Sequence, residues 1–477
     1  RPQGAADSGA EGVCALTGVA SPLHTGNFPQ PNLPGLGQTY VFARNRDIPA
    51  MARYGREAAA SFPIAAGTAE RLAGALQELV SSEREFTTWR MIPAETGKVR
   101  DLLIAFNPAN LEMPLAEALG GEEPARTEAA FIHMTSVPVQ HAGGAGQQFR
   151  PEPNVRMLVL RQLDPANRKT IYHREITAQA LGEAAHDWKV ATANVPDWLT
   201  LPALVNKKLT VSKPPFLAPL SLTSVSRRNY TRGRLAGVDV AGIPLTTAYQ
   251  IFLREGDSQK AARLALRLLL ERNTALLLGI ADARARGVDA LRDLDRTGSL
   301  RQDALRALTW IGALLQAIDH HKEVYVTDAA FRLGQLLAAA DTVHIGYCID
   351  VRDGQIPPTL LGNSLLNTAG QDPARALSLL LQRWKPYAGW AKRRAYVLAR
   401  ANSYGKNDAF ALRRAIYQER EVRETATALH GHIRTLTADK ADAFRAELLL
   451  GYMAGFPPRN RDAAAEAASD AEEDEDA

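Results

Sequence analysis

The sequence predicts an α+β protein, in which a mixed α/β N-terminal part is followed by a C-terminal helical bundle. Two observations support this fold class. Short β-type runs alternate with helical periodicity as far as about residue 205, and the helical period continues almost without interruption beyond residue 257. Prolines, which favour turns over regular elements, concentrate between the two parts at Pro196, Pro202, Pro214, Pro215 and Pro219.

These patterns divide the 477 residues into four expected parts, and the length alone suggests two or three folded domains. The parts are a mixed α/β domain over residues 1–205, a Pro-rich and basic connecting segment over 206–256, a helical bundle over 257–455 and an acidic tail over 456–477. The tail is expected to be disordered because it carries many acids and few groups that pack into a core.

Several short runs in the N-terminal part have the composition of β-strands. They are bounded by turn residues, and we expect them at Thr39–Ala43, Thr87–Ile92, Leu102–Phe106 and Val155–Leu163. Thr68 is the expected N-cap of a helix over about 69–81, and another helix is expected from about Thr177.

The C-terminal part begins with a long amphipathic helix, which Asp257 and Ser258 start. Residues that recur every three or four positions form its expected core row: Ala262, Leu266, Leu269, Asn273, Leu276 and Ile280. Further helices are expected over about 302–320, 328–343, 373–383, 387–402, 408–430 and 437–453. Short connections between helices of this length are typical of an antiparallel bundle.

The net charge of +4 hides an uneven distribution. Residues 462–477 carry eight acids and no base, so 44 acids face 56 bases in the remainder and its net charge is about +12. A body this basic is typical of a protein with a polyanionic partner, and it is equally typical of an Arg-rich protein without one.

Cysteine content and hydropathy favour a cytoplasmic protein outside the membrane. Cys14 and Cys348, the two cysteines, are far apart in sequence and form neither a disulfide framework nor a CxxC metal motif. No apolar run reaches the roughly 18 residues that a membrane-spanning helix needs.

Motifs that would support catalysis do not occur in the sequence. It contains no GxSxG, HExxH, GxxxxGK[ST] or GxGxxG segment. His320 and His321 are adjacent, whereas two metal ligands on one helix face are three or four residues apart, so a role at a helix end is favoured. Cys14 and His24 lack the two further ligands of a structural zinc site. We therefore expect no catalytic residue, no metal and no cofactor.

A first basic cluster lies in the connecting segment. Arg227, Arg228, Arg232 and Arg234 fall within eight residues, beside Tyr230 and small polar donors. Guanidinium groups match phosphate oxygens, and Gly233 would let the backbone approach a ligand closely. The alternative is a solvated loop.

A second basic cluster lies in the helical part and combines cations with aromatic residues. Its cations are Lys385, Lys392, Arg393, Arg394 and Arg400, and Trp384, Tyr387 and Trp390 lie among them. Pro386 suits the first turn of a helix, and residues seven apart on that helix would lie in one row. Cations beside aromatics are typical of a groove that follows a nucleic-acid backbone. The alternative is that the tryptophans belong to the core and the cations are only solvated. A third row, Lys260, Arg263 and Arg267, is the weakest candidate.

Several short motifs follow one another in the order found in one known family. They are Cys14-Ala15-Leu16-Thr17-Gly18 with His24, Tyr40–Asn45, Arg53-Tyr54-Gly55, Thr88-Trp89, Phe331–Ala338 and Leu448–Tyr452. With these motifs the chain resembles the large subunit of the type I-C CRISPR interference complex (Cascade), or a divergent relative of it. That family has a further N-terminal domain ahead of the cysteine motif.

The resemblance implies a non-catalytic subunit of an RNA-guided antiviral complex. Such a subunit binds target DNA, helps to recognise the protospacer-adjacent motif and recruits the helicase-nuclease. Its helical part resembles a Cascade small subunit, and its partners include the backbone and repeat-processing subunits that hold the CRISPR RNA. Two other classes of function stay open: a helical scaffold that binds only proteins, and an uncharacterised hydrolase.

Overall fold

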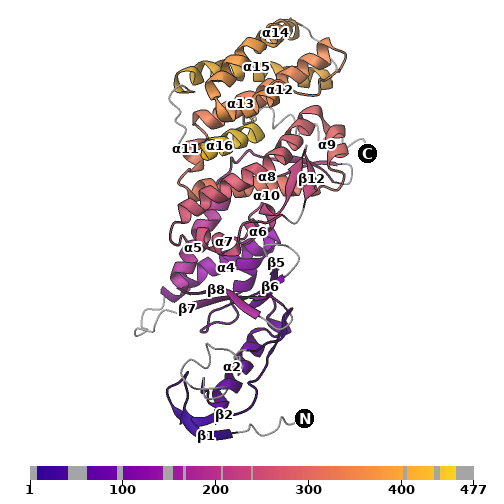
Figure 1. Cartoon of the computed structure of the whole chain (residues 1–477). Helices are drawn as coiled ribbons and strands as arrows, with labels where there is room; N and C mark the ends of the chain where they lie inside the picture. Colours follow the sequence, from indigo (N-terminus) through magenta and orange to yellow (C-terminus); the bar gives the residue numbers. More distant parts are fainter. Residues whose placement is uncertain are drawn as a thin grey trace. The chain divides into compact units, whose positions relative to one another are not determined.

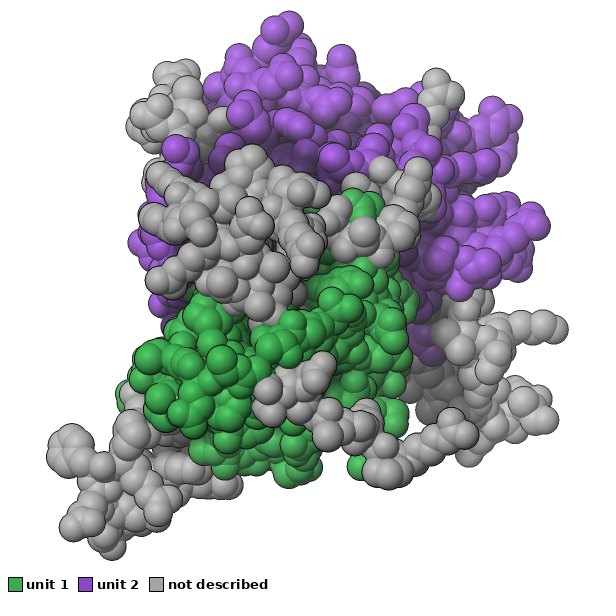
Figure 2. Space-filling view, turned by 60° about the horizontal axis from the view of Figure 1, so that its bottom comes forward, with its two compact units in different colours: residues 1–185 green, residues 186–477 purple. Residues whose placement is uncertain are grey.

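The protein is represented by a computed structural model that describes residues 8–40, 62–93, 100–142, 154–164, 168–205, 208–231, 233–237, 240–400, 406–433 and 441–457. The chain forms two compact units, residues 1–185 and 186–477, which Figure 2 distinguishes by colour. Strands are frequent in the first unit and helices dominate the second, so the α+β class is confirmed (Figure 1).

An antiparallel four-stranded sheet forms the centre of the first unit. Its strands are β5 (Trp89–Pro93), β6 (Arg100–Phe106), β7 (Asn154–Gln162) and β8 (Arg168–Thr177), in that spatial order. Residues from Asp101 to Ala105 of β6 are all buried, because both faces of this strand are covered. On one face Leu102 and Ile104 pack with Leu33, Leu36 and Val80.

Two helices follow β6, and the first of them covers the opposite face of the sheet. These are α3 (Leu115–Gly120) and α4 (Pro124–Ala142), and α3 packs against both β5 and β6. A β-carbon on Gly120 would come within 3.0 Å of the Leu103 side chain, so glycine allows the helix to lie this close. The buried carboxylate of Asp101 accepts two hydrogen bonds from Arg161, at 2.8 and 2.7 Å.

The first part of this unit consists of short elements around a small core. They are β1 (Ser8–Val13), β2 (Ala20–His24), β3 (Asn32–Leu33), β4 (Gly37–Gln38), α2 (Ala66–Leu79) and a 3-10 turn, η2 (Ser82–Arg84). The expected cap Thr68 is wrong: α2 begins at Ala66 because Ala65 still pairs with Leu23 as a β-bridge. Of the strand expected over Thr39–Ala43, Thr39 and Tyr40 are not in a strand, because β4 ends at Gln38, and residues 41–43 lie outside the described ones.

The Pro-rich stretch belongs to the second unit, which begins at His186 within α5 (Ala178–Thr192). It contains β9 (Leu201–Val205), β10 (Lys208–Ser212), α6 (Ser221–Ser226), β11 (Asn229–Thr231), β12 (Arg234–Gly237) and α7 (Leu245–Phe252). Buried donors hold this stretch: the indole N–H of Trp188 donates to the Leu217 carbonyl at 2.9 Å, and the Thr309 hydroxyl donates to Pro215 at 2.9 Å. Pro202 lies within β9, whereas Pro196, Pro214, Pro215 and Pro219 lie in irregular backbone.

Long helices build the rest of the second unit (Figure 1). They are α8 (Ser258–Arg286), α9 (Val288–Leu294), α10 (Ser299–Ala317), α11 (Lys322–Tyr325), α12 (Ala329–Val351), a 3-10 turn η3 (Asn363–Leu365), α13 (Leu366–Gln371), α14 (Pro373–Arg400), α15 (Lys406–His432) and α16 (Ala441–Ala454). The predicted core row of α8 is buried throughout, and the Asp257 side chain caps this helix by accepting from the Lys260 N–H.

A single helix, α14, replaces the two that were expected on either side of Pro386. Proline removes one helical hydrogen bond, but the helix carries buried residues on both sides of it, Trp384 before and Trp390 after. Packing of that continuous face outweighs the local preference for a helix start, so this prediction was wrong. Among the described residues, no helix combines the length and the apolar character that a membrane crossing requires.

Candidate nucleic-acid interface

Three cations of the second basic cluster, Lys385, Lys392 and Arg393, are exposed on α14. Lys385 and Lys392 are seven residues apart and therefore lie in one row, about 10 Å from each other along the helix axis. Within the part of the chain that the structure describes, none of the three has an acidic partner. We call these three residues the α14 basic face. Arg400 is in the same helix, but its side chain lies outside the described ones.

The aromatic residues of this cluster lie on the opposite, inner side of α14. Trp384 and Trp390 are only 6% and 3% exposed, so the indole rings belong to the core. Trp390 donates its indole N–H to Oδ2 of Asp350 at 2.7 Å, and its ring meets Tyr347 edge-on, with centroids 5.9 Å apart. Neither tryptophan is therefore placed to stack on a base, which decides between the two interpretations of the aromatics.

Arg394 also points inward and differs from its neighbours in the cluster. Its Nε donates to Oδ2 of Asp350 at 2.6 Å, and a second guanidinium nitrogen contacts Oδ1. Burial would raise the pKa of Asp350, but the hydrogen bonds from Arg394 and Trp390 outweigh burial and lower it. Asp350 thus stays ionised and joins α12 to two residues of α14. Arg394 serves the helix packing and is taken up by this ion pair.

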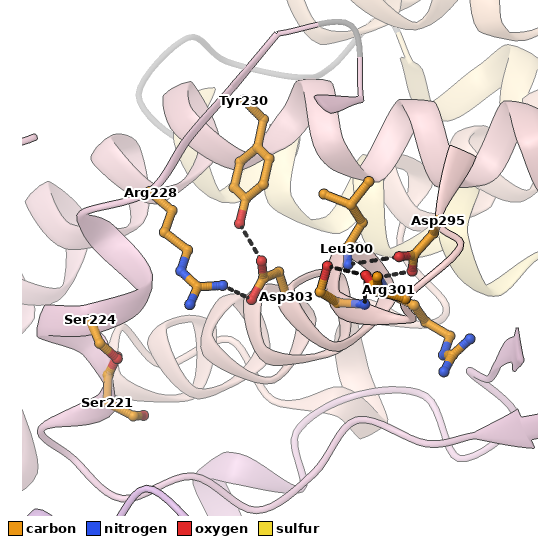
Figure 3. A network of polar contacts seen from close by, with 10 residues as sticks. Ser221, Ser224, Arg228, Tyr230, Asp295, Leu300, Arg301 and Asp303 are labelled. Carbon is orange, nitrogen blue, oxygen red and sulfur yellow. Dashed lines mark hydrogen bonds and ion pairs between the residues drawn. The ribbon is translucent and has the colours of Figure 1, made fainter. Parts of the chain in front are cut away.

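One arginine of the first basic cluster, Arg228, is built into the fold of the second unit (Figure 3). Arg228 forms an ion pair with the buried Asp303 of α10, which also accepts a hydrogen bond from the Tyr230 hydroxyl at 2.8 Å. Arg227 is half-buried, and its carbonyl accepts from the Val240 N–H. Arg234 is exposed on β12, whereas Arg232 lies outside the described residues.

Gly233 serves helix packing instead of the approach to a ligand that the sequence suggested. It is buried with a left-handed backbone (φ of 75°), and a β-carbon there would come within 3.0 Å of the Gly279 Cα in α8. Arg272 of α8 holds the same segment by donating to the carbonyls of Ser226 and Ala241, the latter at 2.8 Å. The hairpin of β11 and β12 is therefore fixed to α8 by contacts that no local sequence signal indicated.

A pocket opens beside the Arg228–Asp303 pair. It is lined by Ser224, Val225, Arg228, Tyr230, Asp303 and Arg306. Arg306 was not singled out in the sequence because it follows the ordinary periodicity of α10, with no cluster of charge around it. The third row, Lys260, Arg263 and Arg267, is exposed on α8, and Arg267 pairs with Glu271 at 3.7 Å as many surface helices do.

Cys14 and His320, two of the residues considered as metal ligands, are in contact with other protein groups. Cys14 is buried, and the backbone N–H of Ala65 donates to its Sγ at 3.3 Å. This bond and one with the Thr17 side chain lower the pKa of Cys14 to about 6, against the effect of burial. His320 pairs with Glu447 of α16 at 2.6 Å. Across the described ranges, no three His, Cys, Asp or Glu residues gather in a way that could hold a metal ion.

No protein-family model matches the sequence, and no curated protein matches it.

Proposed function

We propose that the chain is a non-catalytic, nucleic-acid-binding subunit, and specifically the large subunit of an RNA-guided CRISPR antiviral complex. The observation that carries the binding function is the α14 basic face. Lys385, Lys392 and Arg393 stay exposed and without acidic partners in the described structure, while Arg394 and the tryptophans of the same cluster are used inside the protein. Unpaired cations on one side of a helix are suited to phosphates spaced along a strand.

Two of the motifs that carry the family resemblance support the more specific proposal. Phe331–Ala338 lies at the start of α12 and Leu448–Tyr452 in α16, and these helices pack against each other at Gly334 and Gly451. Two segments that are far apart in sequence thus form one contact, which explains why they would occur together. In this proposal the chain holds target DNA, helps to recognise the protospacer-adjacent motif, docks the helicase-nuclease and contacts the subunits that carry the CRISPR RNA.

A binding experiment over a salt series tests the nucleic-acid function. The wild-type chain and a variant with Lys385→Ala, Lys392→Ala and Arg393→Ala are compared by filter binding to a short labelled single strand. Each lost phosphate contact flattens the slope of log affinity against log salt by about 0.7, so losing three flattens it by about 2. The loss should be similar for all base sequences, because phosphate contacts carry no sequence information.

The matched control removes three cations from another helix. The variant with Lys260→Ala, Arg263→Ala and Arg267→Ala has the same change in net charge, and its slope should stay close to that of the wild type. Equal slopes for the wild type and the folded α14 variant would reject the proposed interface. A wild-type chain that binds no strand even at low salt would favour the scaffold that binds only proteins.

A further inference from the structure

The pocket beside Asp303 brings together side chains from three elements of the second unit (Figure 3). Ser224 belongs to α6, Tyr230 to β11, and Asp303 and Arg306 to α10, while Arg228 lies between α6 and β11. These elements are fixed to one another by the contacts of Arg228 and Tyr230 with Asp303. The lining is therefore held in place before any ligand arrives.

The charges in this pocket do not cancel. The carboxylate of Asp303 uses one oxygen for Arg228 and the other for Tyr230, so its negative charge is already balanced by one guanidinium. Arg306 lies three residues further along α10 and is half-buried. Within the described residues Arg306 has neither an ion pair nor a hydrogen bond from its side chain. The pocket thus holds one surplus cation that the fold does not neutralise.

The polar lining of the pocket suits a small anion. Its enclosed space is about 20 Å³, room for about one water molecule, so an anion would bind at the open mouth of the pocket and would not be enclosed by it. Guanidinium groups bind phosphate oxygens through parallel hydrogen bonds, and the Arg228 side chain is still 38% exposed after pairing with Asp303. A nucleobase or a cofactor would need a larger and more apolar cavity.

We propose that Arg306, with Arg228 beside it, forms a subsite for one backbone phosphate of a bound nucleic acid. This inference rests on the proposed function and adds to it a contact separate from the α14 basic face. Asp303 orients Arg228 toward the pocket. It also limits the net charge of the pocket to that of a single cation. Arg306 supplies the attraction for the phosphate.

The test measures the salt dependence of single-strand binding for Arg306→Ala. The slope of log affinity against log salt should flatten by about 0.7, as expected for one lost contact. Arg306→Lys should restore most of the slope because it keeps the cation. Asp303→Asn should act in the opposite direction and tighten binding at low salt, because it removes the charge that balances Arg228.

Arg292→Ala is the matched control, because it removes one exposed cation from α9, where Arg292 pairs with Asp289. Its slope should equal that of the wild type. Thermal unfolding confirms that each variant is folded. If Asp303→Asn does not fold, the salt slope of Arg306→Ala is by itself the test of the subsite. A folded Arg306→Ala protein with the wild-type slope would overturn the subsite. If the α14 variant still flattens the slope in that case, the proposed function stands; if neither variant does, both proposals fail.

Discussion

Gly334 of α12 and Gly451 of α16 bring their two helices into backbone contact. A β-carbon at position 334 would fall 2.1 Å from the Leu448 carbonyl oxygen, and one at position 451 would fall 2.0 Å from that of Phe331. Real β-carbons do not approach backbone atoms this closely, so any other residue would force the helices apart. The two glycines therefore permit the close crossing of α12 and α16 in the second unit.

Gly334→Ala should destabilise the protein by about 1–3 kcal/mol, because it overpacks a crossing that has no room for a methyl group. The control is Gly389→Ala in α14, where no atom lies within 4 Å of the added β-carbon. That change should stabilise the protein by about 0.5–1 kcal/mol through the helix preference of alanine. Denaturant unfolding measures both values, and equal effects of the two changes would contradict the crossing.

Trp390→Ala should reduce the free energy of unfolding by about 3–5 kcal/mol, because it empties a buried site. It also removes the indole donor to Asp350. Because the ring lies in the core, the salt dependence of strand binding should be unchanged in conditions where the variant is folded. A variant of wild-type stability that binds the strand more weakly would instead indicate that Trp390 stacks on a base.

Asp341 should make stability depend on pH between about 4 and 7. Burial raises its pKa to about 7, against hydrogen bonds from Tyr452 and from the backbone of Gly362 and Asn363. The folded protein then holds a proton that the unfolded chain, with a pKa near 3.8, has lost. The contribution of Asp341 to the free energy of unfolding is fully present below pH 3.8. This contribution falls as the pH rises toward 7.

Asp341→Asn removes this titration, so the wild type should lose stability relative to the variant as the pH rises from about 4 to about 7. Asp293→Asn, which changes an exposed carboxyl group of α9, serves as the control. Chemical unfolding at several pH values measures the difference. A wild type that gains stability relative to Asp341→Asn over this range would show that hydrogen bonding outweighs burial.

Asn194 links three backbone groups of the second unit. Its side chain donates to the carbonyls of Gly312 and His320 at 2.8 and 3.0 Å and accepts from the Lys322 N–H at 2.6 Å. Asn194→Ala should cost about 1–3 kcal/mol of stability, because buried groups lose their partners. Thermal unfolding checks this value, and a change below about 0.5 kcal/mol would mean that water replaces the side chain.

Helical periodicity predicted the second unit well wherever a core row was continuous. The row from Ala262 to Ile280 is buried at every predicted position, since one repeating face of a helix meets one neighbouring surface. Local signals predicted helix ends less well. Pro386 lies inside α14, and the short helix α9 went unpredicted, because packing between distant segments decides such cases.

For the basic clusters, the sequence does not predict which cations form ion pairs and which stay exposed. Arg394 and Lys392 are two residues apart and look alike in the sequence, yet one pairs with Asp350 and the other is exposed. Arg228 pairs with the carboxylate of Asp303, which lies 75 positions further along the chain. Composition gives the number of cations in a segment, but only the fold determines which acids neutralise them. The same reason explains why Arg306 was missed.

The contact between Gly334 and Gly451 also has a consequence for changes in chain length. The Tyr452 hydroxyl, one residue beyond the crossing, donates to Oδ2 of Asp341 at 2.7 Å. A residue inserted between Gly451 and Tyr452 would rotate the tyrosine by about 100° around α16 and break this bond. An insertion before α16 would leave both contacts in register. Natural variants of this protein should therefore differ in length ahead of Ala441 far more readily than between Gly451 and Tyr452.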